Sequence, residues 1–270
     1  MSSIAEFNRA LAELIPRLKD PSFPVHLAGF LKTLVASDNI SIVVYHHQDL
    51  PLIAYNDLPA GQASTIDMFI KGAFLLDPYY LAGTQDKKSG FFSLLSLAPA
   101  GFEDSEYYRM YFRTCGLKEE CGYLIHTDSG GLINISLGHT TDSFTAQQLV
   151  LLEDITPTVD ALATLYWSGQ DSNTSSVNPR EHVESALRHF GTSLLTEREK
   201  QVVDLVLRGF STKAIGDKLA IASQTVKLHR KNAYAKLDVG SQGELFHLFI
   251  DSFISSDDYT GGDPLVNYLN

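Results

Sequence analysis

The chain has 270 residues, 44% of them hydrophobic and 20% charged, which is typical of a folded protein large enough for two domains. Its two cysteines, Cys115 and Cys121, exclude a disulfide-built scaffold, and their spacing is not one used by zinc sites. We expect no metal and no cofactor. No run approaches the ~18 apolar residues of a membrane span, and Glu6 and Arg9 interrupt any signal-like segment, which favours a cytoplasmic protein.

The net charge of −11 is unevenly distributed along the chain. Between Arg198 and Leu237 there are nine basic and three acidic residues, a local charge of +6 that leaves −17 for the rest. A basic segment attached to an acidic body is expected when only one domain meets phosphate.

The first two-thirds of the chain predict an α+β domain. Apolar spacing predicts helices at 4–18, 25–36, 65–76, 105–114 and 144–167, the last capped by Thr145 and kinked or split at Pro157. β-Branched and alternating segments predict strands at 40–46, 50–55, 91–95, 122–127 and 132–139. Residues 128–131 connect the last two as a hairpin, so we expect a mostly antiparallel sheet flanked by helices.

A linker is predicted after this domain, because residues 168–179 are rich in Ser, Asn and Gly. The predicted organisation is a sensing and dimerisation domain, a linker with a connecting helix, an all-α four-helix DNA-binding domain and a C-terminal tail, at 1–168, 169–190, 191–254 and 255–270.

The C-terminal domain predicts a helix-turn-helix. Thr196 caps a first helix that Gly209 ends, and Ser211 caps a second helix at 212–219. A tight turn at 220–222 leads to a third helix at 223–237, and a fourth follows at 242–253. Two helices joined by a tight turn, the second basic on its outer face, fit the major groove of DNA.

The expected DNA-contacting residues lie mainly on the third helix. Lys227, Leu228, Lys231 and Asn232 form its outer face. Phosphate contacts are expected from Thr225, Arg230 and Lys236 and from the start of the second helix, at Ser211 and Lys213.

This segment resembles the LuxR/NarL-type DNA-binding domain over about 60 residues. The matching elements are Leu195-Thr196-x-Arg198-Glu199, Gly209-Phe210-Ser211-x-Lys213-x-Ile215, Thr225-Val226-Lys227-x-His229, Lys236-Leu237 and Ser241-x-x-Glu244-Leu245. The resemblance implies that the third helix recognises DNA and that Lys227, Leu228 and Lys231 face the bases. Two departures are Ala222, where a capping Ser is usual, and Gly216, where Ala is common and which should weaken the second helix by ~1 kcal/mol.

The last helix is apolar on more than one face, which predicts a second partner. The resemblance implies a homodimer contact there, through Leu245, Phe246 and Phe249. Packing of this helix against the N-terminal domain is the alternative, and RNA polymerase is a possible further partner.

Three kinds of sensor were compared for the N-terminal domain. A phosphoacceptor receiver would need paired acids after the first strand, where His46-His47 stands, and an acyl-homoserine-lactone domain would bring a Trp-rich pocket, whereas Trp167 is the sole Trp. The predicted topology resembles a GAF or PAS domain, which holds small molecules beside its sheet. The expected ligand-binding residues are Asp77, Tyr79, Tyr80, Phe92, Tyr107, Tyr108, Tyr111 and Tyr123.

The predicted function is therefore a DNA-binding transcriptional regulator controlled by a small metabolite. Aromatic rings close to acids favour a cationic or amine-bearing ligand, although an ordinary core beside a solvated acidic face would look the same. A signalling adaptor acting through protein contacts and a redox-responsive regulator using Cys115 and Cys121 remain alternatives. No enzyme motif is present in the sequence, so catalysis is not expected.

Overall fold

The computed structural model describes residues 4–46, 50–58, 66, 69–70, 72–99, 101–104, 108, 112–128, 130–168, 185–254 and 261–268. The chain divides into two compact units. The sheet unit contains Met1–Gly61, Tyr79–Leu97 and Gly116–Ser175, and the C-terminal unit contains Gln62–Pro78, Ala98–Cys115 and Ser176–Asn270. No helix in the described part of the chain is both long and apolar enough to cross a lipid bilayer.

The sheet unit is built on five antiparallel strands in the order β2-β1-β5-β4-β3, as predicted. Strand β5 is central and pairs with its neighbours along its whole length. The strands are β1 (Asn39–Tyr45), β2 (Leu52–Asn56), β3 (Gly90–Ser93), β4 (Glu119–His126) and β5 (Leu132–His139).

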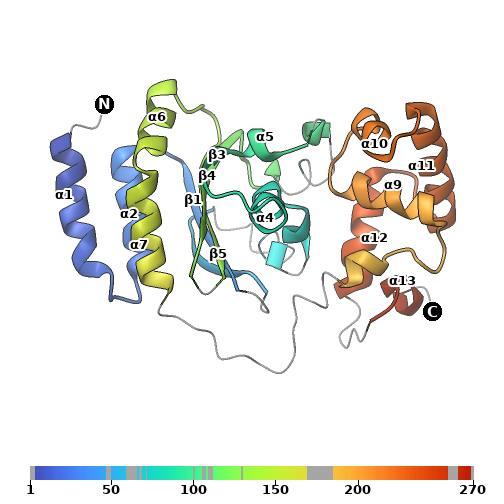
Figure 1. Ribbon diagram of the computed structural model, residues 1–270, viewed down its shortest axis with the longest axis horizontal. Coiled ribbons are helices and arrows are strands. Elements are labelled where there is room, and N and C mark those ends of the chain that lie inside the picture. The colour runs from blue at the N-terminus through green and yellow to red at the C-terminus, as the bar shows by residue number, and fades with distance from the viewer. Residues whose placement is uncertain are drawn as a thin grey trace. The chain divides into compact units, whose positions relative to one another are not determined.

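A layer of helices covers one face of this sheet (Figure 1). It contains α2 (Phe23–Leu34), α6 (Ala146–Asp154) and α7 (Thr156–Trp167), and α1 (Ile4–Leu14) packs against α2 on the side away from the sheet. Alternate strand residues such as Ile42, Tyr123 and Ile135 point into this layer and form one apolar core with it. Thr145 caps α6 through a capping box with Gln148, and the predicted long helix is split before Pro157, as the sequence suggested.

The other face of the sheet is met by α4 (Pro78–Thr84) and α5 (Leu94–Leu97) (Figure 1). An added Cβ on Gly83 of α4 would lie 2.5 Å from the side chain of Leu132, so helix and strand approach closely there. The ring of Tyr45 on β1 lies 5.1 Å from that of Tyr80 on α4. Leu132 and Tyr45 therefore point to the α4 side of the sheet. Their neighbours along the strands, Ile133 and Val44, point to the core side.

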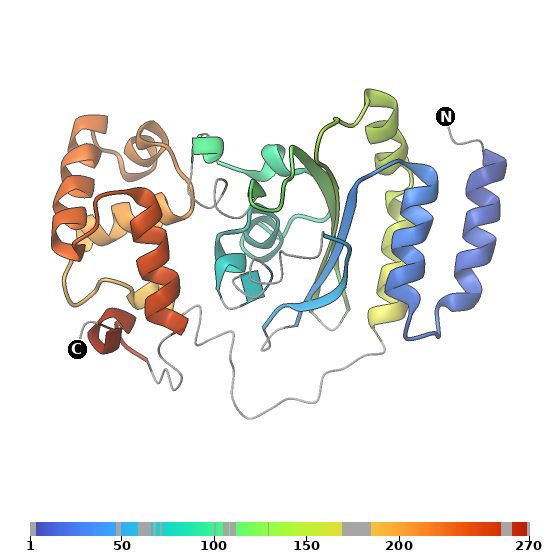
Figure 2. The same ribbon diagram turned by 180° about the vertical axis from the view of Figure 1, so that it is seen from behind.

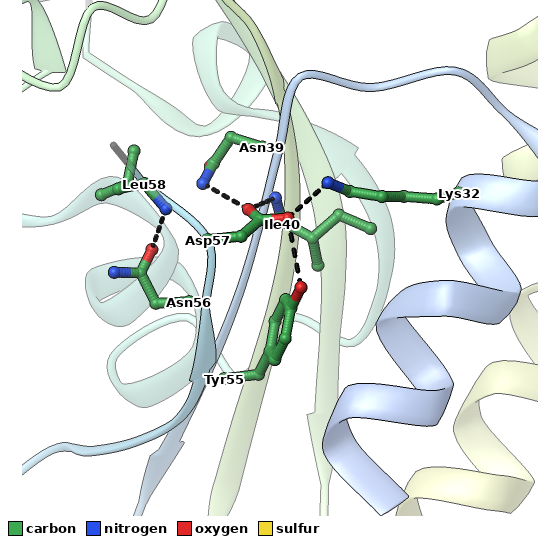
Figure 3. Close-up of polar contacts among 7 residues, drawn as sticks. All are labelled: Lys32, Asn39, Ile40, Tyr55, Asn56, Asp57 and Leu58. Carbon is green, nitrogen blue, oxygen red and sulfur yellow. Dashed lines mark hydrogen bonds and ion pairs between the residues drawn. The ribbon is translucent and has the colours of Figure 1, made fainter. Parts of the chain in front are cut away.

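A polar network ties β2 to the helical layer (Figure 3). The Asp57 carboxylate accepts hydrogen bonds from the amide of Asn39 (2.9 Å), the backbone N–H of Ile40 (2.6 Å) and the hydroxyl of Tyr55 (3.2 Å). Lys32 on α2 adds an ion pair. Burial and the neighbouring Asp57 raise the pKa of Tyr55. The network fixes the edge strand against α2.

Several local predictions differ from the structure. The helix α4 that begins at Pro78 was not predicted, although proline fits the first turn of a helix. The strand expected at 91–95 ends at Ser93, where α5 starts. Part of the helix expected at 65–76 is a 3-10 turn, η2 (Ala73–Leu76). The linker, most of the helix expected at 105–114 and residues 180–184 of the helix expected at 180–190 lie outside the described residues, and residues 185–189 are helical.

The C-terminal unit holds the helix-turn-helix (Figure 2). After a helical stretch at 185–189, its helices are α9 (Glu197–Leu207), α10 (Thr212–Leu219), α11 (Ser223–Leu237), α12 (Gln242–Ile254) and α13 (Pro264–Tyr268). The 3-10 turns η2 and η3 (Phe102–Asp104) belong to the same unit. Helix α13 was not predicted, since that segment was expected to be a tail.

Candidate nucleic-acid interface and sensor face

The first two helices of the candidate DNA-binding module begin at their predicted caps. The Thr196 hydroxyl accepts from the N–H of Glu199 at 3.4 Å, and the Glu199 carboxylate accepts from the N–H of Thr196 at 2.8 Å. The Ser211 hydroxyl accepts from the N–H of Ala214 at 3.2 Å. Such caps satisfy N–H groups that a helix cannot bond internally, so α9 and α10 have defined starts.

The turn between α10 and α11 explains why glycine stands at position 216. The sequence alone predicted only that Gly216 weakens the second helix. Ala220 has the left-handed φ of 53°, and the N–H of Ile221 donates to the carbonyl of Gly216 at 2.9 Å. A Cβ on Gly216 would lie 2.8 Å from the carbonyl oxygen of Ile221. Glycine therefore lets the turn close tightly against α10. Arg198 also donates to the carbonyl of Leu219 at 3.1 Å.

Helix α11 buries one side and exposes the other. Val226, Ala233 and Leu237 are buried against the module, as predicted. The opposite side exposes Lys227, Leu228, Lys231 and Asn232, and the Leu228 side chain is 56% exposed. Thr225 and Arg230 are half-buried beside this face. Ala222 provides no side-chain cap, and the helix starts at Ser223.

The basic residues of the module fall into two groups. In the first group, each basic side chain interacts with another residue of the module. Arg208 pairs with Asp204 at 2.9 Å, Lys218 lies 5.0 Å from the Phe210 ring centroid, and Lys236 pairs with Glu199 at 2.6 Å. In the second, the described residues offer no ion pair or hydrogen bond. This group contains Lys200 and the four residues Lys213, Lys227, Arg230 and Lys231, and these four were predicted to contact DNA.

The ion pair of Lys236 changes how that residue is interpreted. Glu199 is 4% exposed, and the Lys236 ammonium, followed by the backbone N–H of Thr196, holds the pKa of its carboxyl at about 2. Lys236 therefore links α11 to the start of α9. Its predicted phosphate contact stays a prediction, with a buried carboxylate competing for the same ammonium.

The predicted dimer contact on α12 is not available in this conformation. Leu245, Phe246 and Phe249 are fully buried within the single chain. Phe249 packs edge-on against Phe190 at 5.4 Å, and α12 also contacts α9 and α13. The apolar side chains of α12 are thus covered by neighbouring segments of the same unit. This intramolecular packing was not predicted from the sequence.

A C-terminal clasp, which we define as residues 261–268, closes on the entry to this module. The Asp263 carboxylate accepts from the N–H of Gly191 (3.0 Å), the N–H of Ser193 (2.8 Å), the Ser193 hydroxyl (2.6 Å) and the N–H of Leu265 (3.1 Å). Leu265 is fully buried. The clasp therefore fixes the turn that precedes α9.

The predicted ligand-binding residues are divided between the two units of the chain. Asp77, Tyr79 and Tyr80 are buried, and Phe92 and Tyr108 are half-buried. The Tyr79 hydroxyl donates to the carbonyl of Phe92 at 3.1 Å, and the Tyr108 ring stacks on Phe112 at 4.9 Å. Burial and the charge of Glu103 raise the pKa of Tyr108. Tyr107 and Tyr111 lie outside the described residues.

Tyr123, which was also predicted to bind a ligand, points to the helical layer that contains α2 and α7. It is fully buried in the core on the α2 and α7 side, where its ring lies 5.2 Å from Phe91 and its hydroxyl donates to the carbonyl of Leu152 at 2.8 Å. On the α4 side, β5 carries two buried polar residues, Asn134 and Ser136, between Leu132 and Gly138. Sequence reasoning missed them, although two polar residues alternating with Ile133, Ile135 and Leu137 were a visible signal.

Neither cysteine forms a disulfide, and both are buried. Burial, reinforced by Glu120, raises the pKa of the Cys121 thiol. A redox sensor needs an accessible thiolate, so these surroundings disfavour the redox alternative. Among the described residues no cluster of His, Cys, Asp or Glu could hold a metal ion, and His47 lies outside them.

The helix-turn-helix and its row of unpaired basic side chains define a DNA-binding protein of the transcription-regulator class. Residues 193–249 match the model of the bacterial regulatory proteins of the luxR family. A relative from Aeromonas salmonicida, named as an HTH-type transcriptional regulator in the exeN 3′ region, is 32% identical over 189 residues, covering 67% of this chain and 96% of the relative. The chain belongs to the luxR family.

Two further similarities concern separate parts of the chain. The MalT transcriptional regulator of Serratia proteamaculans is 45% identical over 53 residues, which are 20% of this chain and 6% of MalT. The crystal structure of the VqsR LBD domain from Pseudomonas aeruginosa covers 61% of this chain and 98% of that domain, with 28% identity and a TM-score of 0.54. The chain is therefore a luxR-type DNA-binding regulator with an N-terminal domain similar to a ligand-binding domain.

Proposed function

We propose that this chain binds specific duplex DNA sites through α11 and that a small molecule held by its N-terminal domain controls this binding. The observation that carries the first part is the group of basic side chains without a partner among the described residues. Lys227 and Lys231 stand one helical turn apart on an exposed face, at the spacing that places both over one groove.

The second part is supported by the similarity of the N-terminal domain to the VqsR LBD domain. A ligand that binds one state of the N-terminal domain better than another shifts the population of the DNA-binding state by its difference in affinity. The amine-bearing effector predicted from the sequence stays a prediction, and isothermal titration with a panel of amines tests it directly.

Selection from a random duplex library tests the DNA-binding part. The full chain should enrich one sequence, and its affinity should fall steeply with salt because lysine and arginine release counterions from phosphate. An inverted repeat among the selected sites would support a homodimer. Enrichment of no sequence, or affinity independent of salt, would instead favour an adaptor that acts through protein contacts.

A further inference from the structure

Gln224 stands at the centre of the exposed face of α11, although it was not among the residues predicted to contact DNA. The helix packs on α9 and α10 along its other side, where Val226, Ala233 and Leu237 are buried (Figure 1). With about 100° of rotation per residue, Gln224 lies about 160° around the helix from Val226 and about 180° from Ala233. It therefore faces away from the module core more directly than Lys227, which lies about 100° from Val226.

Gln224 also continues the line of residues that were predicted to face the bases. It precedes Lys227, Leu228 and Lys231 by three, four and seven residues, the spacing that places side chains on one face of a helix. All four residues are exposed. From Gln224 to Lys231 the helix rises about 10 Å, which is about the height of three stacked base pairs. One face of α11 is thus long enough to meet consecutive base pairs, and Gln224 is its first member.

The neutral amide of Gln224 is better suited to a base than to a phosphate. It carries a donor, Nε2, beside an acceptor, Oε1, and the major-groove edge of adenine presents the complementary N6 donor and N7 acceptor. A phosphate offers acceptors only, so it would engage half of this amide. Among the described residues the amide has no hydrogen-bond partner, and its exposed position leaves both groups available.

The flanks of this face already provide cations for phosphate. Arg230 is half-buried at one side of α11, and Lys213 is exposed near the start of α10. Phosphates line the edges of the groove and base edges form its floor, so a residue at the centre of the exposed face meets bases. Recognition helices contact base edges with their N-terminal residues, and Gln224 is the second residue of α11.

We propose that Gln224 recognises an adenine in the major groove, with Oε1 accepting from the N6 amino group and Nε2 donating to N7. This assignment rests on the proposed binding of duplex DNA by α11. The recognised site therefore contains an adenine at one fixed position, beside the bases that Lys227 and Lys231 contact.

Selection from a random duplex library with matched variants of the full chain is the first test. The wild-type chain should prefer adenine at one position by about tenfold, and Gln224→Ala should lose that preference while the other positions stay selective. Because Gln224 is exposed, its replacement leaves the module core unchanged. Asn232→Ala is the matched control, since it removes an exposed amide of the same helix about two turns further on. This control should keep the adenine preference.

Base analogues in the selected duplex test the two hydrogen bonds separately. At the adenine position, 7-deazaadenine replaces the N7 acceptor by a C–H group, and unsubstituted purine lacks the N6 amino group. Each analogue should weaken binding of the wild-type chain about fivefold more than binding of Gln224→Ala, in fluorescence anisotropy titrations at fixed salt. Equal losses for both chains would mean that the adenine acts through the shape of the duplex, which overturns the proposal.

The outcomes separate this assignment from the broader function. If the wild-type chain enriches one sequence and Gln224→Ala keeps every preference, α11 still binds DNA but Gln224 recognises no base. A uniform loss of affinity for all sequences would make Gln224 a phosphate contact, and a lost preference for a base other than adenine would place that base opposite it. Each of these results overturns the proposal and leaves the DNA-binding function standing. If the wild-type chain enriches no sequence, the proposed function fails and this assignment fails with it.

Discussion

The recognition helix α11 and the central strand β5 both carry polar side chains that the described chain leaves without a partner, in opposite surroundings. Lys227 and Lys231 are exposed, where water solvates an ammonium at no cost to folding. Asn134 is buried, where the same lack of a partner destabilises the protein. An exposed unpaired group is available to any partner, whereas a buried one is tolerated only where a particular partner arrives. The comparison shows that the lack of a partner costs little on the exposed face of α11 and is unfavourable in the centre of the sheet.

The largest expected effect concerns the exposed lysines of α11. Combined replacement by Lys227→Ala and Lys231→Ala should weaken binding to a library-selected duplex by about 100-fold, because each base-facing lysine contributes roughly 1–3 kcal/mol. A fluorescence anisotropy titration at fixed salt measures this loss.

Lys200→Ala is the matched control, since Lys200 lies on α9 outside the predicted contacts. It removes the same charge and should change affinity much less. Equal losses for the control and the double variant would mean that total charge, rather than the α11 face, attracts the DNA.

The next effect concerns Lys236, whose ammonium forms an ion pair with Glu199 inside the module. Lys236→Met should lower the free energy of unfolding of the module by about 2 kcal/mol, because it leaves the buried carboxylate of Glu199 without its cation. Urea denaturation at pH 7 measures this difference. Lys231→Met, an exposed lysine of the same helix, is the control and should change stability by less than about 0.5 kcal/mol.

The same pair predicts a pH dependence. The folded pKa of Glu199, about 2, lies below the ordinary value of 4.5, so its contribution is present above pH 4.5 and is lost as pH falls toward 2. The gap between the wild-type and Lys236→Met chains should therefore narrow between pH 5 and pH 2. A gap that stays constant over this range would mean that the ion pair is not its source.

Local chemistry made the helix-turn-helix predictable. The caps Thr196 and Ser211 and the apolar spacing of Val226, Ala233 and Leu237 act within a few residues, so the bounds of α10 and α11 and their exposed face could be predicted from the sequence. The ion pair between Lys236 and Glu199 could not be predicted from the sequence, because the two residues lie 37 positions apart in the chain.

The sensor face depended on contacts between distant segments. Which alternate residues of β4 and β5 face α4 depends on how the distant helices pack on the sheet, so the sequence alone did not show that Tyr123 points to the core and Asn134 to the α4 side. A one-residue choice of face moves a whole set of side chains. The burial of Leu245, Phe246 and Phe249 was not predicted either. It depends on contacts of α12 with α13 and Phe190, which are separate segments of the chain.

A smaller effect is expected at the clasp, where a carboxylate is fully partnered. Asp263→Ala removes the acceptor of four hydrogen bonds and should lower stability by about 1–2 kcal/mol, with faster hydrogen exchange at the amides of Gly191 and Ser193. Asp251→Ala is the control, because Asp251 is exposed on α12. Unchanged exchange at both amides would remove the clasp as the element that fixes this turn.

The smallest expected effect is a gain. Ala222→Ser adds the missing cap to α11 and should raise stability by about 1 kcal/mol, because the serine hydroxyl can accept from an N–H of the first turn. Ala235→Ser, at an exposed interior position of the same helix, is the matched control and should be neutral or slightly destabilising, since serine is a weaker helix former than alanine. Thermal unfolding of both variants separates a capping effect from the chemistry of serine itself. If Ala222→Ser gave no gain, the first-turn amides of α11 would already be satisfied in solution, and α11 would start differently from the helices that Thr196 and Ser211 cap.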